Sequence, residues 1–288
     1  GRSYDGFYPS VNASYQILPN LQLRASYART LGRPNFNFVV PNYDVIEDLA
    51  TDGADGLIVA RNPALNPWTA DNFDVAIEYY FKAGGVVSAG VFRKDITDGF
   101  GTNTVVLDDA LLAQFELDRA YRGWDLQTTF NIGQPIRIEG VEFNYQQPLT
   151  FLPAFARGVS VYGNATLLEL EGPAAATPEL YEKTGNWGLS YSRGRFGLGL
   201  NWNYRGPRSS ASSTYGAGGQ TRFRSRITLD LNSEFRFSRR LSVFFNARNL
   251  TNSRLYQDGF GDLTPAYSHQ RQGADYGAKL SAGVRGRF

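Results

Sequence analysis

The sequence predicts an all-β protein whose antiparallel strands form the wall of a membrane-spanning β-barrel. Apolar and polar residues alternate with a period of two along most of the 288 residues, which is the signature of β-strands. No run of about eighteen consecutive apolar residues occurs, so a bundle of transmembrane helices is excluded. The alternating segments are also long, since a tilted strand needs about 9–11 residues to cross a bilayer and soluble strands usually have about 5–6.

The segment FGLGLNWNYRG at 196–206 shows the pattern most clearly, with large apolar side chains at every second position and glycine or asparagine between them. In a soluble β-sandwich the apolar face would pack on a second sheet and the polar face would meet water. In a barrel the apolar face meets lipid and the polar face lines the lumen. Aromatic residues near strand ends and the lack of a helical layer favour the barrel. We therefore expect Leu200 and Trp202 to face lipid, and Asn201 and Asn203 to face the lumen.

The turns divide the chain into eleven strands. Short and long connections alternate along it, as they do in bacterial barrels, where the short turns are periplasmic and the long loops are outside. This alternation holds only if 123–147 is one strand, with the Gly and Pro at 133–135 forming a bulge or kink inside it. The expected strands are 8–18, 20–31, 69–82, 86–97, 123–147, 157–170, 184–193, 195–206, 222–236, 240–250 and 273–288. One connection, DDALLAQFEL at 108–117, predicts a short helix that begins near Asp108.

Eleven is an odd number, whereas bacterial single-chain barrels usually have an even number of strands. An open sheet would leave unpaired backbone groups in lipid, at several kcal/mol each. We therefore expect residues 1–288 to be a single-domain fragment, the C-terminal half of a barrel of about 22 strands, with an N-terminal part missing before Gly1. A complete barrel of ten or twelve strands, with one strand miscounted, is the alternative.

The composition excludes several functions. The 29 Lys and Arg against 27 Asp and Glu give a net charge of only +2, with no basic stripe for nucleic acid. There is no cysteine and only one histidine, His269, so no transition-metal cluster and no cofactor are expected. A Ser-His-acid site would also have to use His269, and we do not expect an enzyme. A passive porin or a small outer-membrane barrel enzyme is the alternative function.

Candidate ligand-binding residues are aromatic and cationic. Aromatic side chains in the predicted loops could stack on sugars or catechols, and a row of arginines beside Asp230 and Glu234 could attract anionic ligands. The arginines could instead form ion pairs with neighbouring strands or dock another part of the protein, and His269 could be a solvated loop residue. The candidates are Trp68, Tyr43, Arg222, Arg224, Arg226, Tyr215, Tyr267 and His269.

Several segments resemble, in family order, recurring parts of TonB-dependent receptors. They are LPNLQLRASYARTLGRPNF at 18–36, NPALNPWTADNFDVAIEYYF at 62–81, VFRKDI at 91–96, IEGVEFNYQQPLTFLP at 138–153, RGVSVYGNAT at 157–166 and FFNARNLTN at 244–252. The chain ends in GVRGRF, similar to the closing strand that barrel-assembly machinery recognises. Together these segments are most similar to receptors of Xanthomonas- and Caulobacter-like bacteria.

The resemblance implies the C-terminal barrel portion of a receptor in the outer membrane of a Gram-negative cell, without its plug domain. It implies TonB-energised uptake of a scarce nutrient, a ferric siderophore or an oligosaccharide; cobalamin, haem and nickel chelates are further family substrates. The implied partners are outer-membrane lipid, an N-terminal plug with the remaining strands, and a small-molecule ligand. They also include the TonB-ExbB-ExbD system, acting through an N-terminal box, and the assembly machinery, acting through Phe288.

Overall fold

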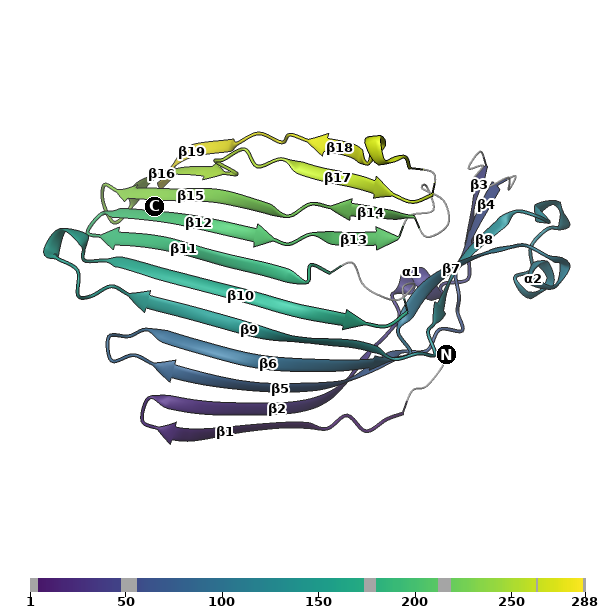
Figure 1. Ribbon diagram of the computed structural model, residues 1–288, viewed down its shortest axis with the longest axis horizontal. Coiled ribbons are helices and arrows are strands. Elements are labelled where there is room, and N and C mark those ends of the chain that lie inside the picture. Colours follow the sequence, from purple (N-terminus) through teal and green to yellow (C-terminus); the bar gives the residue numbers. More distant parts are fainter. Residues whose placement is uncertain (1–4, 48–55, 174–179, 212–218, 263, 287–288) are drawn as a thin grey trace.

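The computed structural model describes residues 5–47, 56–173, 180–211, 219–262 and 264–286. Eleven antiparallel strands form one sheet, which we call the wall (Figure 1). In spatial order they are β1 (Ser10–Leu18), β2 (Leu21–Gly32), β5 (Trp68–Tyr80), β6 (Val86–Thr97), β9 (Ile136–Pro148), β10 (Val159–Glu171), β11 (Lys183–Arg193), β12 (Phe196–Arg205), β15 (Arg226–Arg236), β16 (Leu241–Arg248) and β19 (Lys279–Gly286). The predicted number of wall strands is confirmed.

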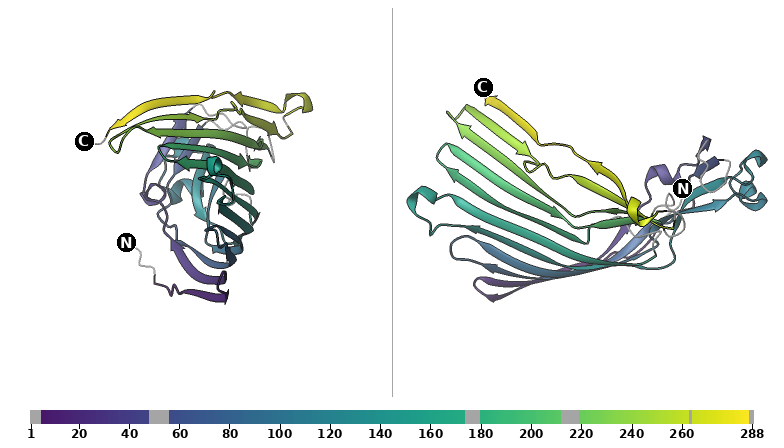
Figure 2. Two further views of the ribbon diagram at one scale, coloured as in Figure 1. Left: turned by 90° about the vertical axis from the view of Figure 1, so that its left-hand side faces the viewer. Right: turned by 45° about the horizontal axis from the view of Figure 1, so that its top comes forward.

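The wall is strongly curved. Seen end-on it forms an arc with β1 at one end and β19 at the other (Figure 2, left). Connections at one end of the strands are short, and the turn between β11 and β12 uses Gly194 at a φ of +59°, a left-handed conformation that glycine adopts without a steric cost. The connections at the opposite end are longer, and four of them, β2 to β5, β6 to β9, β12 to β15 and β16 to β19, carry secondary structure of their own. By the rule for bacterial barrels, the short-turn end faces the periplasm and the long-loop end faces outside.

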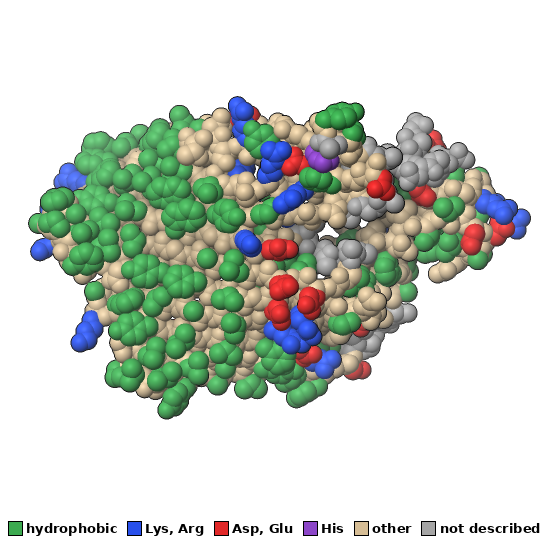
Figure 3. Space-filling view, viewed as in Figure 1, with side chains coloured by type: hydrophobic (Ala, Val, Ile, Leu, Met, Phe, Trp, Pro, Cys, Tyr) green, Lys and Arg blue, Asp and Glu red, His purple; other side chains and the backbone are tan. Residues whose placement is uncertain are grey.

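Alternation along the strands gives the arc two chemically different faces. On one, Trp187 lies opposite Trp202, which lies opposite Leu229 on the next strand. One residue away along the chain, on the other face, Asn186 lies opposite Asn203. The convex face carries hydrophobic side chains over most of the wall (Figure 3). The register places the polar residues that alternate with them on the concave face. The register thus gives Leu200, Trp202, Asn201 and Asn203 the facing that the alternation predicts.

The prediction that 123–147 is one strand is wrong. Residues 125–131 form β8 (Asp125–Asn131), which pairs with loop strands, and the wall strand β9 begins only at Ile136. At the junction Ile132 is 5% exposed and its N–H donates to the Gly99 carbonyl, while Pro135 has no N–H to continue a ladder. The chain therefore changes sheets there. The count of eleven survives because β8 lies entirely on the long-loop side.

A second four-stranded sheet, which we call the loop module, lies at the long-loop end. It contains β3 (Tyr43–Glu47), β4 (Gly56–Ala60), β8 and β7 (Phe100–Val106), and β4 and β8 pair in parallel. The predicted helix forms as α2 (Asp109–Gln114), where the Asp108 side chain accepts a hydrogen bond from the Leu111 N–H. Its core residues are almost completely buried, namely Ile58, Ala60, Leu107, Leu112, Leu117 and Leu126. Two loops distant in sequence thus share one hydrophobic core.

A third sheet continues part of the wall beyond its long-loop end. The strands β13 (Arg208–Ala211), β14 (Gln220–Phe223), β17 (Leu255–Phe260) and β18 (Gln270–Ala274) follow or precede β12, β15, β16 and β19 along the chain, and they keep the same spatial order. We call this sheet the wall extension. The predicted single strands 222–236 and 273–288 are each broken in two where the wall passes into it.

Four short helices complete the described secondary structure outside α2. They are α1 (Phe36–Val39) and the 3₁₀ turns η1 (Arg119–Tyr121), η2 (Ala154–Ala156) and η4 (Ala266–Ser268). In the part of the chain that the structure describes, no helix has the length and apolar character that a membrane crossing requires.

Candidate functional site

Charged side chains cross the convex face near the long-loop ends of β5, β6, β9 and β10 (Figure 3). Arg93 lies opposite Glu139, which lies opposite Glu169. One step closer to the loops, the Asp95 carboxylate accepts hydrogen bonds from Arg93 Nε and Arg137 Nε, each at 2.8 Å. Arginine is costly in the hydrocarbon region and much less so near its edge. This charged band therefore marks the outer limit of the lipid-facing belt.

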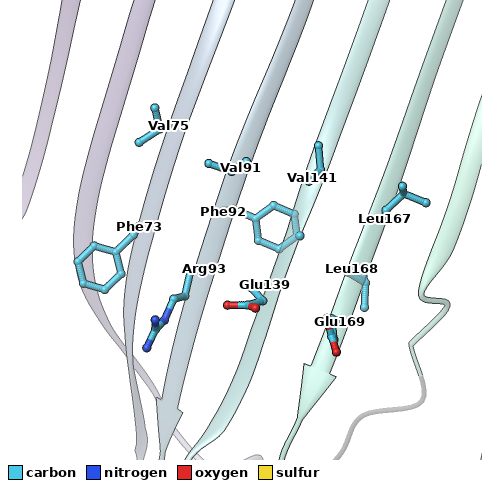
Figure 4. A pocket seen from close by; sticks show the side chains of 11 residues that line it. Phe73, Val75, Val91, Phe92, Arg93, Glu139, Val141, Leu167, Leu168 and Glu169 are labelled. Atoms are coloured by element: carbon cyan, nitrogen blue, oxygen red, sulfur yellow. The ribbon is translucent and has the colours of Figure 1, made fainter.

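A shallow groove of about 570 Å³ adjoins the charged band (Figure 4). Its lining includes apolar side chains from four strands, such as Phe73, Val75, Val141 and Leu167, and its charged rim holds Arg93, Glu139 and Glu169. The apolar side chains belong to the convex face, where they meet lipid. We therefore assign the groove to the membrane boundary. The concave face and the loops are the surfaces that can meet a ligand from water.

Charged residues on the concave face gather toward the two ends of the arc. Near the β1 end, Arg24 Nε lies 3.0 Å from a Glu78 carboxylate oxygen. Near the β19 end, Arg285 Nη1 lies 4.0 Å from Glu234. Between them, the concave face of β9, β10, β11 and β12 carries mainly asparagine, serine, threonine and glycine. The middle of the lumen-facing wall thus carries many side chains that can form hydrogen bonds and very few charged ones.

The three candidate arginines do not form the single continuous row that the sequence predicts. A break separates β14 from β15, so Arg222 lies in the wall extension, Arg226 lies in the wall and Arg224 lies between them. Arg224 donates from Nε and Nη2 to the two oxygens of Asp258, each at 2.7 Å. Arg226 donates from Nη2 to the Ser253 carbonyl at 2.7 Å. Arg224 therefore forms an ion pair with a neighbouring strand, which was the alternative to ligand binding. Ligand binding by the three arginines stays a prediction.

The Arg224–Asp258 pair makes the wall extension sensitive to strong acid. Asp258 is only 7% exposed, and the hydrogen bonds from Arg224 hold the pKa of its carboxyl below the ordinary value of 3.8. A carboxyl with a lowered pKa stabilises the folded state above its unfolded pKa, and this stabilisation is lost as the pH falls through the folded value. We expect the protection factors of residues 255–262 and 264–274, which compare exchange with that of unprotected amides at the same pH, to stay unchanged from neutral pH to about 4 and to fall below that.

Arg224→Gln supplies the control for this pH dependence, because it removes the charge that lowers the pKa of Asp258. In that variant we expect lower protection factors in residues 255–262 and 264–274 already at neutral pH, since the Asp258 carboxylate loses its bidentate partner. The further loss of protection below pH 4 should be smaller or absent, because without Arg224 the pKa of Asp258 is no longer held as far below its unfolded value. An identical pH profile in the variant and the original protein would contradict the assigned role of the pair.

Trp68 and Tyr43 lie apart from the arginines. Trp68 begins β5 and its indole packs against Gly32, where an added Cβ would lie 2.1 Å from the ring, so the residue has a structural role at the top of the wall. The Lys94 Nζ lies 5.9 Å from the centre of the same ring. Tyr43 begins β3 in the loop module and is 42% exposed.

The remaining candidates belong to the wall extension and its connections. Tyr267 in η4 is 92% exposed, which leaves its ring available to a ligand. His269 is half-buried, and its ring centre lies 4.5 Å from that of Phe260. Tyr215 lies outside the described residues. The structure therefore brings Arg222, Arg224, Tyr267 and His269 to one sheet and its borders, but it places Tyr43 and Trp68 in other elements.

Asn249 is a structural residue that the sequence reasoning missed. It follows β16 with a φ of +51°, its N–H donates to Asp230 at 2.8 Å, and its side-chain amide donates to the Gly277 carbonyl at 3.1 Å. Its amide oxygen also accepts from the Ser253 N–H at 2.9 Å. Asn249 thus joins three segments where the wall passes into the wall extension. The signal was present in the segment RNLTN, because asparagine tolerates positive φ and often bonds nearby backbone.

The fold and its two faces define the class of protein. The wall is antiparallel and curved, with an apolar convex face and a polar concave face, and it has short turns at one end and structured loops at the other. These features define an outer-membrane β-barrel protein. A family model described as TonB dependent receptor-like, beta-barrel matches residues 1–250. The chain belongs to the TonB-dependent receptor β-barrel family, whose proteins lie in the outer membrane of Gram-negative bacteria.

Solved receptor structures have the same fold. A variant of the ferric enterobactin receptor PfeA from Pseudomonas aeruginosa, in complex with enterobactin, superposes with a TM-score of 0.68 at 16% identity and covers 97% of this chain. The siderophore receptor PirA from Acinetobacter baumannii gives 0.68 at 16% identity over 98% of this chain. The ferripyoverdine receptor of Pseudomonas aeruginosa gives 0.61 at 15% identity over 99% of this chain.

This chain matches only part of each of these receptors. The chain spans 40% of the length of the PfeA chain, 41% of the PirA chain and 33% of the ferripyoverdine receptor chain. No curated protein matches the chain in sequence.

Proposed function

We propose that residues 1–288 are the C-terminal barrel portion of a TonB-dependent receptor that takes up a scarce nutrient across the outer membrane. The observation that supports this most directly is an open, curved wall of eleven strands in a chain of this family. We treat the wall, the wall extension and the loop module as one barrel domain, because the loop module and the wall extension are built on connections between wall strands.

The two unpaired edges of the wall are the reason to propose that it belongs to a larger, closed barrel. In the described sheet β1 pairs only with β2, and β19 pairs only with β16. Unpaired backbone groups in hydrocarbon cost several kcal/mol each, so both edges need further strands. A barrel of about 22 strands, with the remaining strands and a plug domain supplied by the rest of the receptor, satisfies both edges.

The proposed partners follow from membership of the receptor family. They are outer-membrane lipid around the convex face, the plug inside the lumen, and the TonB-ExbB-ExbD system acting through an N-terminal box. We also propose that the barrel-assembly machinery reads the closing strand through Phe288, a residue outside the described part of the chain.

The proposed cargo is a ferric siderophore or an oligosaccharide, and the role is transport, not catalysis. The solved relatives include receptors for ferric enterobactin and ferripyoverdine, which supports the siderophore class. The exposed Tyr267 and the arginines of the wall extension are the proposed first contacts for cargo arriving from outside, together with Tyr43 of the loop module. Tyr215, Trp68 and His269 remain proposed contacts on sequence grounds.

Uptake by cells that carry the complete receptor tests this function. We expect accumulation of either labelled ferric enterobactin or a labelled neutral oligosaccharide in cells with the receptor, and loss of accumulation when TonB is deleted. Entry that is independent of TonB and proportional to the external concentration would instead indicate a passive porin. Cells that lack the receptor provide the background.

A further inference from the structure

Two arginines lie opposite each other on the concave face, at the long-loop end of the wall. Arg205 ends β12, and its partner across the strands is Arg226, the first residue of β15. Arg205 is two residues from Asn203, so both arginines lie on the lumen-facing side. Like charges directly opposite each other on neighbouring strands destabilise a sheet, so this pair needs a physical reason.

The pair lies far from the short turns at the periplasmic end of the wall. The strand β12 starts beside the Gly194 turn and has 10 residues, which at about 3.3 Å per residue places Arg205 roughly 30 Å along the strand from that turn. Beyond the pair, β13 and β14 continue the wall toward the outside (Figure 1). A molecule that enters the lumen from outside therefore reaches these arginines before it reaches the middle of the wall.

The described residues supply no carboxylate partner for either arginine. No oxygen of a described Asp or Glu lies within 4.0 Å of either guanidinium group. Arg226 donates from Nη2 to the Ser253 carbonyl at 2.7 Å, but its Nε is buried without a hydrogen-bond partner among the described residues. Arg205 is exposed. The described protein thus leaves the two positive charges without a counter-charge.

The lumen face around the pair is also basic. Arg248 of β16 lies opposite Lys279 of β19, which makes a second pair of like charges on the concave face. On the outer half of β12, β15, β16 and β19, the described charged side chains of this face are Arg205, Arg226, Arg248, Lys279 and a single carboxylate, Asp230. A concave surface that carries mainly one sign of charge raises the local concentration of ions of the opposite sign.

Tyr181 gives the pair an aromatic neighbour. The guanidinium carbon of Arg205 lies 5.7 Å from the centre of the Tyr181 ring, and that of Arg208 lies 5.3 Å from the same ring. A guanidinium within about 6 Å of an aromatic ring is attracted to its face. Tyr181 therefore restricts the positions of Arg205, whose N–H groups donate no hydrogen bond to the described residues and can reach a ligand.

A guanidinium presents its N–H groups as a planar fork that matches the oxygens of an anionic group, and such charge-assisted hydrogen bonds are stronger than neutral ones. We propose that Arg205 and Arg226 bind an anionic group of the cargo, a carboxylate or catecholate of a ferric chelate, at the outer mouth of the lumen. The anion lies between the two guanidinium groups and relieves their repulsion. The inference rests on the proposed function of nutrient receptor, and of the two proposed cargo classes it selects an anionic chelate over a neutral oligosaccharide.

Binding of a panel of compounds to the purified complete receptor tests this proposal. The panel contains ferric enterobactin and ferric citrate as anionic chelates, ferrichrome as a neutral chelate, and a set of neutral oligosaccharides. We expect at least one anionic chelate to bind more tightly than every neutral compound, with an affinity that falls as salt is added. We expect Arg205→Gln and Arg226→Gln each to weaken this binding roughly tenfold, because each removes a charge-assisted hydrogen bond.

Arg236→Gln is the matched control. It removes the same charge from the same face of β15 at the short-turn end, and it should leave the affinity unchanged. Arg205→Lys keeps the charge and should weaken binding less than Arg205→Gln does. Heat-modifiable migration of each variant shows that the barrel is folded, and limited proteolysis of the plug shows that it is seated.

Tighter binding of a neutral compound, or no binding of any compound on the panel, would overturn the inference. Equal affinity for the anionic chelate in Arg205→Gln, Arg226→Gln and the original protein would also overturn it, and a plug loosened in those variants alone would assign the pair to plug docking instead. TonB-dependent uptake of any labelled compound on the panel would in each case leave the receptor function standing. Uptake that does not depend on TonB would contradict the receptor function itself.

Discussion

Replacing Leu231 with arginine is expected to destabilise the folded barrel by about 2–4 kcal/mol, the cost of a cation near the middle of the lipid-facing belt. Leu231 lies in the middle of the apolar stretch of β15, opposite Leu200 on one neighbour and Ala247 on the other. Ala247 is fully buried in the wall, so a long charged side chain at 231 has no polar neighbour there. Denaturant titration of the complete receptor folded into bilayers, followed by tryptophan fluorescence, measures the change.

Asn232→Arg is the matched control, because the substituted residue is adjacent in sequence and lies on the opposite face. Asn232 lies opposite Gly199 and Asn246 on the concave side, where the new guanidinium remains in the aqueous lumen. We expect a loss well below that of Leu231→Arg. Equal losses at the two positions would show that the wall does not separate lipid from water as the register indicates.

Leu126→Ala is expected to lower the stability of the loop module by about 2–5 kcal/mol, the usual cost of truncating a fully buried leucine. Leu126 is 0% exposed and packs in one core with Ile58, Leu107 and Leu112, which come from two different loops. Opening of this core should expose both loops to protease together while the wall remains intact. Native-state proteolysis of the complete receptor, with mapping of the cleavage sites, measures this effect.

Val106→Ala is the control in the same module, because Val106 ends β7 and is 62% exposed. Substitutions at exposed positions usually change stability by less than about 0.5 kcal/mol. Rapid cleavage in Leu126→Ala that is confined to residues 98–135 and spares residues 43–60 would contradict the shared core. Unchanged cleavage in both variants would contradict the burial of Leu126.

Much of the wall follows from alternation alone. The strand at 196–206 was predicted with the correct facing, and the short helix after Asp108 was predicted together with its cap. These features depend on neighbouring residues only, either the parity of side chains along a strand or a side chain that bonds the backbone three residues on. The family resemblance, read from the same residues, agrees with the family match over residues 1–250.

The predictions that the structure contradicts, the single strand at 123–147 and the continuous row of arginines, fail for the same reason. Residues 125–131 place Leu126 and Phe130 between polar residues, as a wall strand would, yet β8 pairs with β4, which lies more than sixty residues earlier in the chain. Arg224 appeared to belong to a lumen-facing row, but Asp258, whose carboxylate pairs with it, is 34 residues away. In both cases the partner lies far away in the sequence, so the residues around 125–131 or around Arg224 contain no pattern that predicts the pairing.

The sequence by itself determined that this chain is a two-faced β-wall of eleven strands and that it resembles one receptor family, since side-chain parity and family segments are local properties. The tertiary structure alone decided that two loops share a core, that Arg224 is paired with Asp258, and that Arg205 lies opposite Arg226 at the mouth of the lumen. Each of these depends on strand pairing between distant segments, whose free energy comes from contacts that form only when the chain is folded.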